Sequence, residues 1–324
     1  MCRKVFSVLL NFFVVIISAE WNSNDYMKRE HSLIKPYQGK GMMVPYWDFQ
    51  GITLVTPNYV RVTPDRQSQM GSLWNSIPCN VLAWELHVNF KIHGHGKDLF
   101  GDGMAIWYTK DRMIQGPVFG NMDYFHGLAI FIDTYSNHNG EHNHQHPYIS
   151  AMINNGTLHY DHDRDGTHTS LAGCEVKLRN VYYDTHLTIR YEKDTLTVLT
   201  DVDNKGEWKE CFKTSGVKLP TGYYWGVSAA TGELSDNHDI LSMRLYELDS
   251  SDVDVVSAED RSKIIPSAEK FEAPREHVED PKPAWSGTKT FFVMLFVFLL
   301  IIAIAIAGIS WYRDQQEHAK KRFY

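Results

Sequence analysis

The stretch that decides the fold is Leu128-Ala129-Ile130-Phe131-Ile132-Asp133-Thr134-Tyr135-Ser136-Asn137. Its first five residues are apolar and predict a buried strand, which ends abruptly at an acid. Asp133 and Asn137 lie where the strand gives way to a loop. A carboxylate, a main-chain carbonyl and an amide oxygen can converge on one point there. Hard oxygen donors around one point are what Ca²⁺ requires, although an ordinary turn also favours Asp at such a position.

Short strand-like runs recur on both sides of this stretch. Residues 81–92 alternate apolar and polar side chains, which is typical of a strand with one buried face. Residues 187–191 and 195–199 flank Glu192-Lys193-Asp194 and predict a hairpin. Further strands are expected at residues 104–108, 149–153, 223–230 and 240–248. Many strands with Gly, Asn and Asp between them predict an all-β fold, an antiparallel β-sandwich of the jelly-roll type.

The two ends of the 324-residue chain differ in composition from this part. Residues 1–19 combine Arg3 and Lys4 with an apolar run and small residues, which predicts a cleaved signal peptide. Residues 290–312 contain an uncharged apolar run, and twenty helical residues rise about 30 Å, the thickness of a bilayer core. Residues 249–289 are polar and predict a stalk. The ordered domain is therefore expected at residues 26–248, with a cytosolic tail at residues 313–324.

The charge and the cysteines narrow the class of protein. The net charge of −7 is mild, and the absence of a basic stripe argues against a nucleic-acid partner. A signal peptide places the domain in an oxidising compartment, where disulfides form. Cys174 and Cys211 flank a predicted hairpin, so we expect them to pair and Cys79 to stay buried and free. Asn155-Gly156-Thr157 is a glycosylation sequon, which fits a luminal loop.

Four further polar motifs stand near strand ends. Gly101-Asp102-Gly103 precedes the strand at 104–108, and Gly232 to Asp239 forms a polar loop before the last strand. Asp161, Asp163 and Asp165 lie within five residues, which favours a cation loop, although a solvated acidic turn has the same pattern. The fourth motif, residues 138–146, is rich in His and is either a metal-binding or pH-sensing loop or a solvated polar one.

Taken together, these motifs resemble the animal L-type, or legume-type, lectins of the early secretory pathway, in the branch of vesicular integral-membrane lectins and their ER-resident relative. The resemblance extends from Lys35 to Leu248 and then through the span and tail. The motifs that carry it are Trp47-Asp48-Phe49, residues 101–108, Gly116 to Gly120, His126 to Thr134, Asn154 to Thr157, Leu219 to Tyr224 and Lys321 to Tyr324.

The resemblance implies a legume-lectin-like β-sandwich that binds high-mannose N-glycans of glycoprotein cargo with Ca²⁺ as its cofactor. It implies that the metal ligands are Asp133, the carbonyl of Tyr135, Asn137 and Asp165. It implies that the carbohydrate-binding residues are Ser68, Asp102, Asn137, His162, Gly232, Glu233 and Leu234. It also implies the Cys174–Cys211 disulfide and a role in sorting, transport or quality control between ER and Golgi.

The tail and one loop residue add detail to this expectation. Lys321-Arg322-Phe323-Tyr324 resembles the trafficking signal of the family and implies recognition by vesicle coat components. The implied protein crosses the membrane once, with its lectin domain in the lumen of the ER, the ER–Golgi intermediate compartment or the Golgi. Glu233 departs from the close relatives, which carry Asp there, so its extra methylene puts a carboxylate contact to the sugar in doubt.

Two other function classes remain as alternatives to a non-enzymatic lectin. Some glycoside hydrolases share this sandwich, and they need two carboxylates at a defined separation. Asp161 and Asp163 form the nearest candidate pair, but they are expected in a loop rather than on one strand face. The second alternative is a structural adaptor in the membrane with an inactive sugar site.

Overall fold

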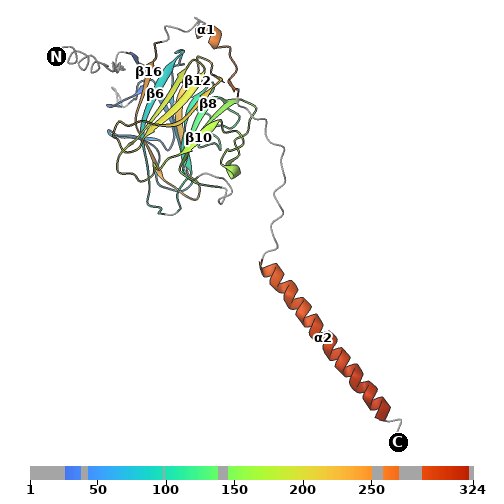
Figure 1. Cartoon of the computed structure of the whole chain (residues 1–324). Helices are drawn as coiled ribbons and strands as arrows, with labels where there is room; N and C mark the ends of the chain where they lie inside the picture. Colours follow the sequence, from blue (N-terminus) through green and yellow to red (C-terminus); the bar gives the residue numbers. More distant parts are fainter. Residues whose placement is uncertain are drawn as a thin grey trace, which may run out of the picture. The chain divides into compact units, whose positions relative to one another are not determined.

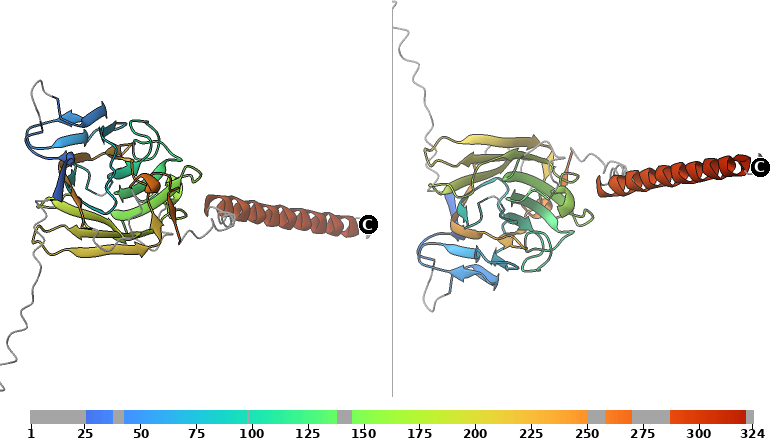
Figure 2. Two further views of the ribbon diagram at one scale, coloured as in Figure 1. Left: turned by 90° about the horizontal axis from the view of Figure 1, so that it is seen from above. Right: turned by 90° about the horizontal axis from the view of Figure 1, so that it is seen from below.

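A computed structural model describes residues 26–37, 43–97, 99–137, 145–249, 258–269 and 287–320. Within these residues the domain consists of two stacked antiparallel sheets (Figures 1 and 2). The 8-stranded sheet has the order β13 (Lys209–Ser215), β12 (Thr195–Asp201), β11 (Thr185–Glu192), β6 (Trp84–His93), β16 (Asn237–Glu247), β4 (Val60–Thr63) and β3 (Leu54–Val55), with β1 (Met27–Leu33) also paired to β16. The 7-stranded sheet has the order β10 (Ala172–Glu175), β9 (Tyr148–Asn155), β8 (His126–Asp133), β7 (Gly103–Thr109), β15 (Tyr224–Ala230), β5 (Met70–Asn75) and β2 (Trp47–Gly51). The predicted all-β sandwich is confirmed.

The core lies between the two sheets. On β6, the even-numbered residues from Trp84 to Ile92 are buried and the odd-numbered ones are partly exposed, as the alternation in the sequence predicts. Leu86 and Val88 of this strand belong to the same apolar cluster as Ile106 of β7 and Ile130 of β8. Side chains from the inner faces of both sheets therefore form one continuous core.

The strands β7 and β8 are buried on both faces, which explains their unbroken apolar sequence. Their outward-facing residues, such as Trp107 and Phe131, belong to a second apolar cluster. Loop residues complete this cluster, among them Phe119, Phe125 and Tyr160. An antiparallel sheet with one solvated face would show alternation, so the cover of loops is what allows the continuous run.

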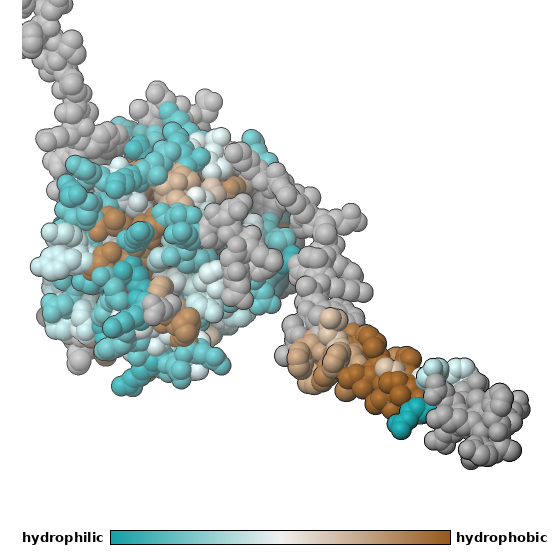
Figure 3. Space-filling view, turned by 60° about the horizontal axis from the view of Figure 1, so that its bottom comes forward, coloured by the Kyte–Doolittle hydropathy of each residue, from teal (hydrophilic) through white to brown (hydrophobic). Residues whose placement is uncertain are grey.

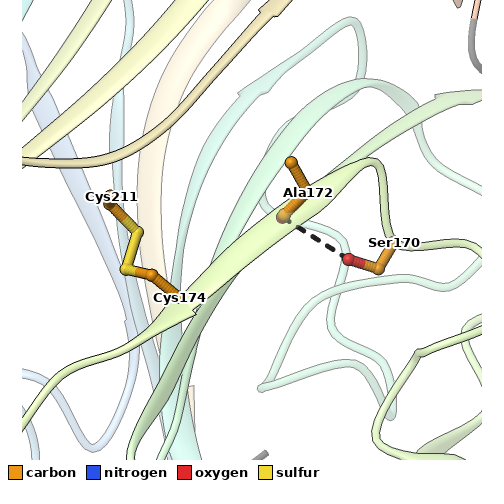
Figure 4. The surroundings of a disulfide bond; sticks show 4 residues. All are labelled: Ser170, Ala172, Cys174 and Cys211. Carbon is orange, nitrogen blue, oxygen red and sulfur yellow. Dashed lines mark hydrogen bonds between the residues drawn. A yellow bond between two sulfur atoms is a disulfide. The ribbon is translucent and has the colours of Figure 1, made fainter.

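A disulfide joins Cys174 of β10 to Cys211 of β13 and so connects the edges of the two sheets (Figure 4). The expected pairing is confirmed, and Cys79 is free and buried. Burial raises the pKa of the Cys79 thiol to about 11, which keeps it protonated and unreactive. The bridge spans 37 residues in sequence. By the loop-entropy model, closing such a loop stabilises the fold by about 3–4 kcal/mol.

Part of the segment expected to be a stalk folds against the domain instead. β17 (Ser267–Ala268) pairs with β14 (Val217–Lys218), and Ala268 is buried. The short helix α1 (Ala258–Arg261) ends in Arg261, whose guanidinium contacts Asp194 and the hydroxyl of Tyr191. Composition alone did not predict this docking, because backbone pairing and one ion pair can hold a polar segment that has few apolar side chains.

The C-terminal helix α2 (Gly287–Lys320) forms a separate unit of the chain. An 18-residue window within residues 291–313 has a mean hydropathy of 3.2. None of their side chains is buried, and Figure 3 shows a hydrophobic surface along them. Among the described residues, this is the one helix long and apolar enough to cross a membrane. The predicted signal peptide and the tail residues 321–324 lie outside the described residues.

A buried histidine near the start of β16 gives the fold a testable dependence on pH. Nδ1 of His238 lies 2.7 Å from Oγ1 of Thr63, and burial lowers the pKa of His238 to about 3. The unfolded chain binds a proton on this residue near pH 6.5, whereas the native state does not, so stability is lost as the pH falls below about 6.5. The charged or titratable groups around the ring are Asp239, His93, Arg179 and Asp65.

We predict that acidification from pH 7.5 to 5.5 costs about 1.4 kcal/mol through His238. His238→Asn keeps a polar partner for Thr63, but its side chain does not titrate. Over the same pH range, the unfolding free energy of the variant should therefore fall less than that of the wild type, and the difference should equal the cost assigned to His238. Urea unfolding of both proteins across this pH range measures the difference. Parallel pH curves for wild type and variant would contradict the assignment.

Candidate functional site

The end of strand β8 brings two of the predicted acids together. Asp133 is the last residue of β8, and its register partner on β7 is Gly103. The residue before Gly103 is Asp102, whose carbonyl accepts a hydrogen bond of 3.0 Å from the Thr134 N–H. The Gly101–Asp102 peptide bond is cis. Sheet pairing therefore places Asp102 beside the loop that follows Asp133.

Asp165 reaches the same place from a different segment. A short 3-10 helix, η3 (His162–Arg164), has Asp161 as its N-cap and ends at Asp165 in the left-handed conformation, with φ of 50°. The Oδ1 atom of Asp165 accepts a hydrogen bond of 2.9 Å from the Asn137 N–H. Asp161 accepts one from the Asp163 N–H, so its carboxylate is used as a cap. The acidic run that the sequence singled out is thus divided between capping and the site.

The carboxylates of Asp133 and Asp165 form a buried cluster with His146. The potential ligand atoms of the three residues all lie within 4.8 Å of one another. His146 Nε2 is 3.8 Å from Asp133 Oδ2 and 3.9 Å from Asp165 Oδ2. His146 was not among the predicted site residues, although it belongs to the His-rich stretch that the sequence marked. The other part of that stretch, residues 138–144, lies outside the described residues.

The two buried carboxylates of this cluster favour a positive charge beside them. Burial raises the pKa of the Asp133 carboxyl, against the influence of the nearby His146 ring. Burial disfavours the imidazolium of His146, but the carboxylates of Asp133 and then Asp165 outweigh it and raise the pKa of the ring. The Oδ2 atom of Asp165 is buried and accepts no hydrogen bond from the described residues. Buried polar atoms are normally paired, so this oxygen and its neighbours fit a bound cation.

Asp102 faces the loop that starts at Gly232. The Gly232 N–H donates to the Asp102 carboxylate. A Cβ at position 232 would lie 3.1 Å from Oδ2 of Asp102, a separation that few real Cβ contacts reach, so glycine suits this close approach. Burial, helped by the negative charge of Asp133, raises the pKa of the Asp102 carboxyl to about 6. The carboxylate is thus partly desolvated, and a ligand hydroxyl bound there would compete with little water.

Backbone contacts hold the predicted loop Gly232-Glu233-Leu234 in place. The Ser68 N–H donates to the Gly232 carbonyl over 2.9 Å, and Gln67 Nε2 donates to the Glu233 carbonyl over 2.7 Å. Leu234 packs close to Gly101. A Cβ atom added at Gly101 would lie 3.7 Å from the Cβ of Leu234. Glu233 itself is exposed, and its carbonyl makes the contact to the protein.

His162 packs against two aromatic rings. Its ring centroid is 4.7 Å from that of Tyr160 and 5.5 Å from that of Phe119. Nε2 of His162 lies 2.9 Å from the carbonyl oxygen of Pro117, which can only accept, so Nε2 carries the proton. In the neutral ring this leaves Nδ1 as a hydrogen-bond acceptor. The Asp165 N–H donates to the His162 carbonyl over 3.0 Å and connects this residue to the carboxylate cluster.

The structure brings most of the predicted residues into one region. The contacts above, and a 3.0 Å hydrogen bond from the Tyr135 N–H to Asp133 Oδ1, connect the four proposed metal ligands with the proposed sugar-binding residues: Asp133, Tyr135, Asn137 and Asp165 with Asp102, His162, Ser68 and the loop 232–234. Asn155 lies elsewhere, because its register partner on β8 is His126, at the opposite end of the strand from Asp133. At 3.3 Å per residue that separation is about 23 Å.

Comparison with known proteins agrees with this fold. A family model described as the legume-like lectin family matches residues 24–255. Human vesicular integral-membrane protein VIP36 is 50% identical over 309 residues, covering 93% of this chain and 86% of that protein. Human VIP36-like protein is 49% identical over 302 residues, with the same coverage of 93% and 86%.

Solved structures give the same result. The crystal structure of the VIP36 exoplasmic/lumenal domain in its Ca²⁺/Man2-bound form matches with a TM-score of 0.70 and 55% identity, covering 75% of this chain and 98% of that chain. Its Ca²⁺/Man3GlcNAc-bound form matches with a TM-score of 0.70 and 54% identity, covering 75% and 99%. The carbohydrate recognition domain of Emp47p, at 20% identity with a TM-score of 0.56, shares the fold. On the match to the family model and the identity to these relatives, the chain belongs to the legume-like lectin family.

Proposed function

We propose that this protein is a Ca²⁺-dependent lectin that binds high-mannose N-glycans on glycoproteins. The observation that carries the proposal is the juxtaposition of two units. One is the buried carboxylate pair Asp133–Asp165, in which Asp165 Oδ2 accepts no hydrogen bond from the described residues and fits a cation. The other is the adjoining polar surface of Asp102, His162 and the loop 232–234. The VIP36 exoplasmic/lumenal domain, which is 54–55% identical, has been solved with both Ca²⁺ and mannose-containing ligands.

The residues proposed to hold Ca²⁺ are Asp133, Asn137, Asp165 and the carbonyl of Tyr135. All four supply oxygen, as a hard cation requires. Hydrogen bonds already join these four residues in two pairs. The Tyr135 N–H donates to Asp133 Oδ1 over 3.0 Å, and the Asn137 N–H donates to Asp165 Oδ1. The bound ion supplies positive charge to two buried carboxylates and joins the loop after β8 to η3.

The residues proposed to hold the sugar supply both hydrogen-bond donors and acceptors. A mannose presents hydroxyls that are both donors and acceptors. The Asp102 carboxylate accepts, the Asn137 amide donates and accepts, and Nδ1 of neutral His162 accepts. Ser68, Gly232, Glu233 and Leu234 form the rim of the proposed subsite. Because these groups are held by the fold and the metal before the ligand arrives, binding costs less ordering entropy.

The setting of the site in the cell is part of the proposal. Residues 1–19 would direct the domain into the lumen, residues 290–312 would cross the membrane once, and Lys321 to Tyr324 would recruit vesicle coat components. The protein would then sort or transport glycoprotein cargo among the ER, the intermediate compartment and the Golgi. Asn155 is exposed at a strand end and accepts hydrogen bonds from Thr157, a local geometry compatible with the proposed glycosylation there.

A hydrolase is the less favoured function. The acid pair nearest to such chemistry was Asp161 and Asp163, and Asp161 is engaged as the cap of η3. We therefore propose a binding protein without enzymatic activity. Incubation of the purified protein with high-mannose glycan should release no sugar, and released mannose would overturn this part of the proposal.

The metal site gives the first prediction about function. Ca²⁺ at one hundred times its dissociation constant should stabilise the wild-type protein by about 2.7 kcal/mol. Asp165→Asn removes one of the two buried charges and should abolish this increase in thermal stability. Asp163→Asn, an exposed residue of η3 two positions before Asp165, is the matched control and should retain it. Thermal unfolding with Ca²⁺ and with chelator measures the stabilisation by Ca²⁺ in all three proteins. An equal loss of this stabilisation in both variants would refute the ligand assignment.

The division between metal and sugar gives the second prediction. Asn137→Ala should lose both Ca²⁺ and glycan, because Asn137 is assigned to both. Asp102→Ala should lower the affinity for high-mannose glycan roughly 100-fold, as expected for the loss of two charge-assisted hydrogen bonds, and leave Ca²⁺ affinity unchanged. Calorimetry with Ca²⁺ and a glycan array with Ca²⁺ or chelator measure the two affinities. Ca²⁺ loss of the same size in both variants would contradict the assigned roles.

A further inference from the structure

A buried ion pair adjoins two loops of the proposed sugar site. The guanidinium of Arg179 donates to the Asp236 carboxylate through two bonds, Nε to Oδ2 and Nη2 to Oδ1, each 2.7 Å long. The side chain of Arg179 is 7% exposed and that of Asp236 is fully buried. Asp236 follows Leu234 by two residues, so this pair fixes the end of the loop 232–234. Such a bidentate pair sets orientation as well as distance.

The same guanidinium also reaches the other half of the site. Its central carbon lies 3.8 Å from the centre of the Phe100 ring, in a cation–π contact. Phe100 directly precedes Gly101-Asp102. One side chain, from the segment between β10 and β11, therefore contacts the two loops that carry Asp102 and Gly232.

The space around the pair is closed. A Cβ at Gly94 would lie 2.1 Å from Asp236 Oδ1 and 3.3 Å from Arg179 Nη2, so only glycine fits there. A lysine at position 179 would keep the charge, but it would offer neither the planar fork nor the flat face that stacks on Phe100. The contacts therefore need arginine itself.

We propose that Arg179 is a positioning residue of the carbohydrate site, which holds the Asp102 and Gly232 loops at the separation that a mannose needs. This inference rests on the proposed function. Arg179 touches none of the proposed Ca²⁺ ligands in any described contact, so its effect is confined to the sugar half of the site.

The chain offers a matched control for its test. Arg61 makes the same kind of bidentate pair with Asp239, with bonds of 2.7 and 2.8 Å. Asp239 lies three residues after Asp236, but Arg61 extends from β4 and contacts neither the loop before Gly101 nor the loop 232–234 in any described interaction. Arg61→Lys therefore makes the same change in a bidentate ion pair near the site, at a side chain that is 22% exposed, without altering the two loops.

The experiment uses the full-length protein in detergent, with Ca²⁺ present and a high-mannose glycan as the probe. Arg179→Lys should weaken glycan binding at least tenfold and leave Ca²⁺ affinity within twofold of wild type. Arg61→Lys should leave both affinities within twofold. Glycan affinity that is unchanged in Arg179→Lys, or lost equally in Arg61→Lys, would overturn the proposal.

Two further measurements keep the test decisive. Amide hydrogen exchange at residues 100–103 and 231–236 should speed up in Arg179→Lys and not in Arg61→Lys. This readout needs no glycan, so it separates a failure of the positioning role from a failure of wild type to bind sugar.

Should Arg179→Lys not fold, Phe100→Leu removes the ring contact and keeps the ion pair. It should weaken glycan binding about threefold, and unchanged affinity with unchanged exchange would equally refute the role of Arg179.

Discussion

The burial of two like charges at the end of β8 is the constraint on which the rest of the site depends. Asp133 and Asp165 are both nearly inaccessible to water and face a single imidazole. An ionised carboxylate in such a place carries a desolvation penalty of several kcal/mol unless it is paired. Partial compensation comes from His146 and from the N–H groups of Tyr135 and Asn137. A cation at the same point compensates both charges at once, which is why metal binding and the conformation of the two loops cannot be separated.

The second apolar cluster makes this burial possible. Without it, the outer face of β7 and β8 would be solvated, and the carboxylates at the strand ends would lie in water. Tyr160 and Phe119 connect the cluster to the site, because both also pack against His162. Gly166 lies so close to the Tyr160 ring that a Cβ would come within 2.2 Å of it. The loop that carries Asp165 is thus seated on the cluster by contacts that have nothing to do with the metal.

The sequence predicted the central strands and the acids at their ends, because both have strong local signals. The continuous run of β8, the alternation of β6 and the hairpin β11–β12 all appear as expected. The short edge strands β2, β3 and β10 have no such pattern, and their pairing comes from neighbours distant in sequence. The docking of residues 258–269 was missed for the same reason. Asp102, Asp133 and Asp165 were predicted from motifs and resemblance, whereas His146 and Arg179 were not. Only the folded chain shows that these two side chains face carboxylates.

The two halves of the site are held by different forces, and this has a consequence for Ca²⁺ dependence. The half with Asp102 and the loop 232–234 is fixed by protein contacts: the Gly232 N–H, Ser68, Gln67 and the buried Arg179–Asp236 pair. The half with Asn137 and His162 is connected to Asp165, so its position depends on how the buried charges are balanced. Removal of the ion should therefore release Asn137, which is connected to the Asp165 carboxylate, and leave the first half in place. A ligand that needs both halves is then bound only when the metal is present, although the metal need not touch it.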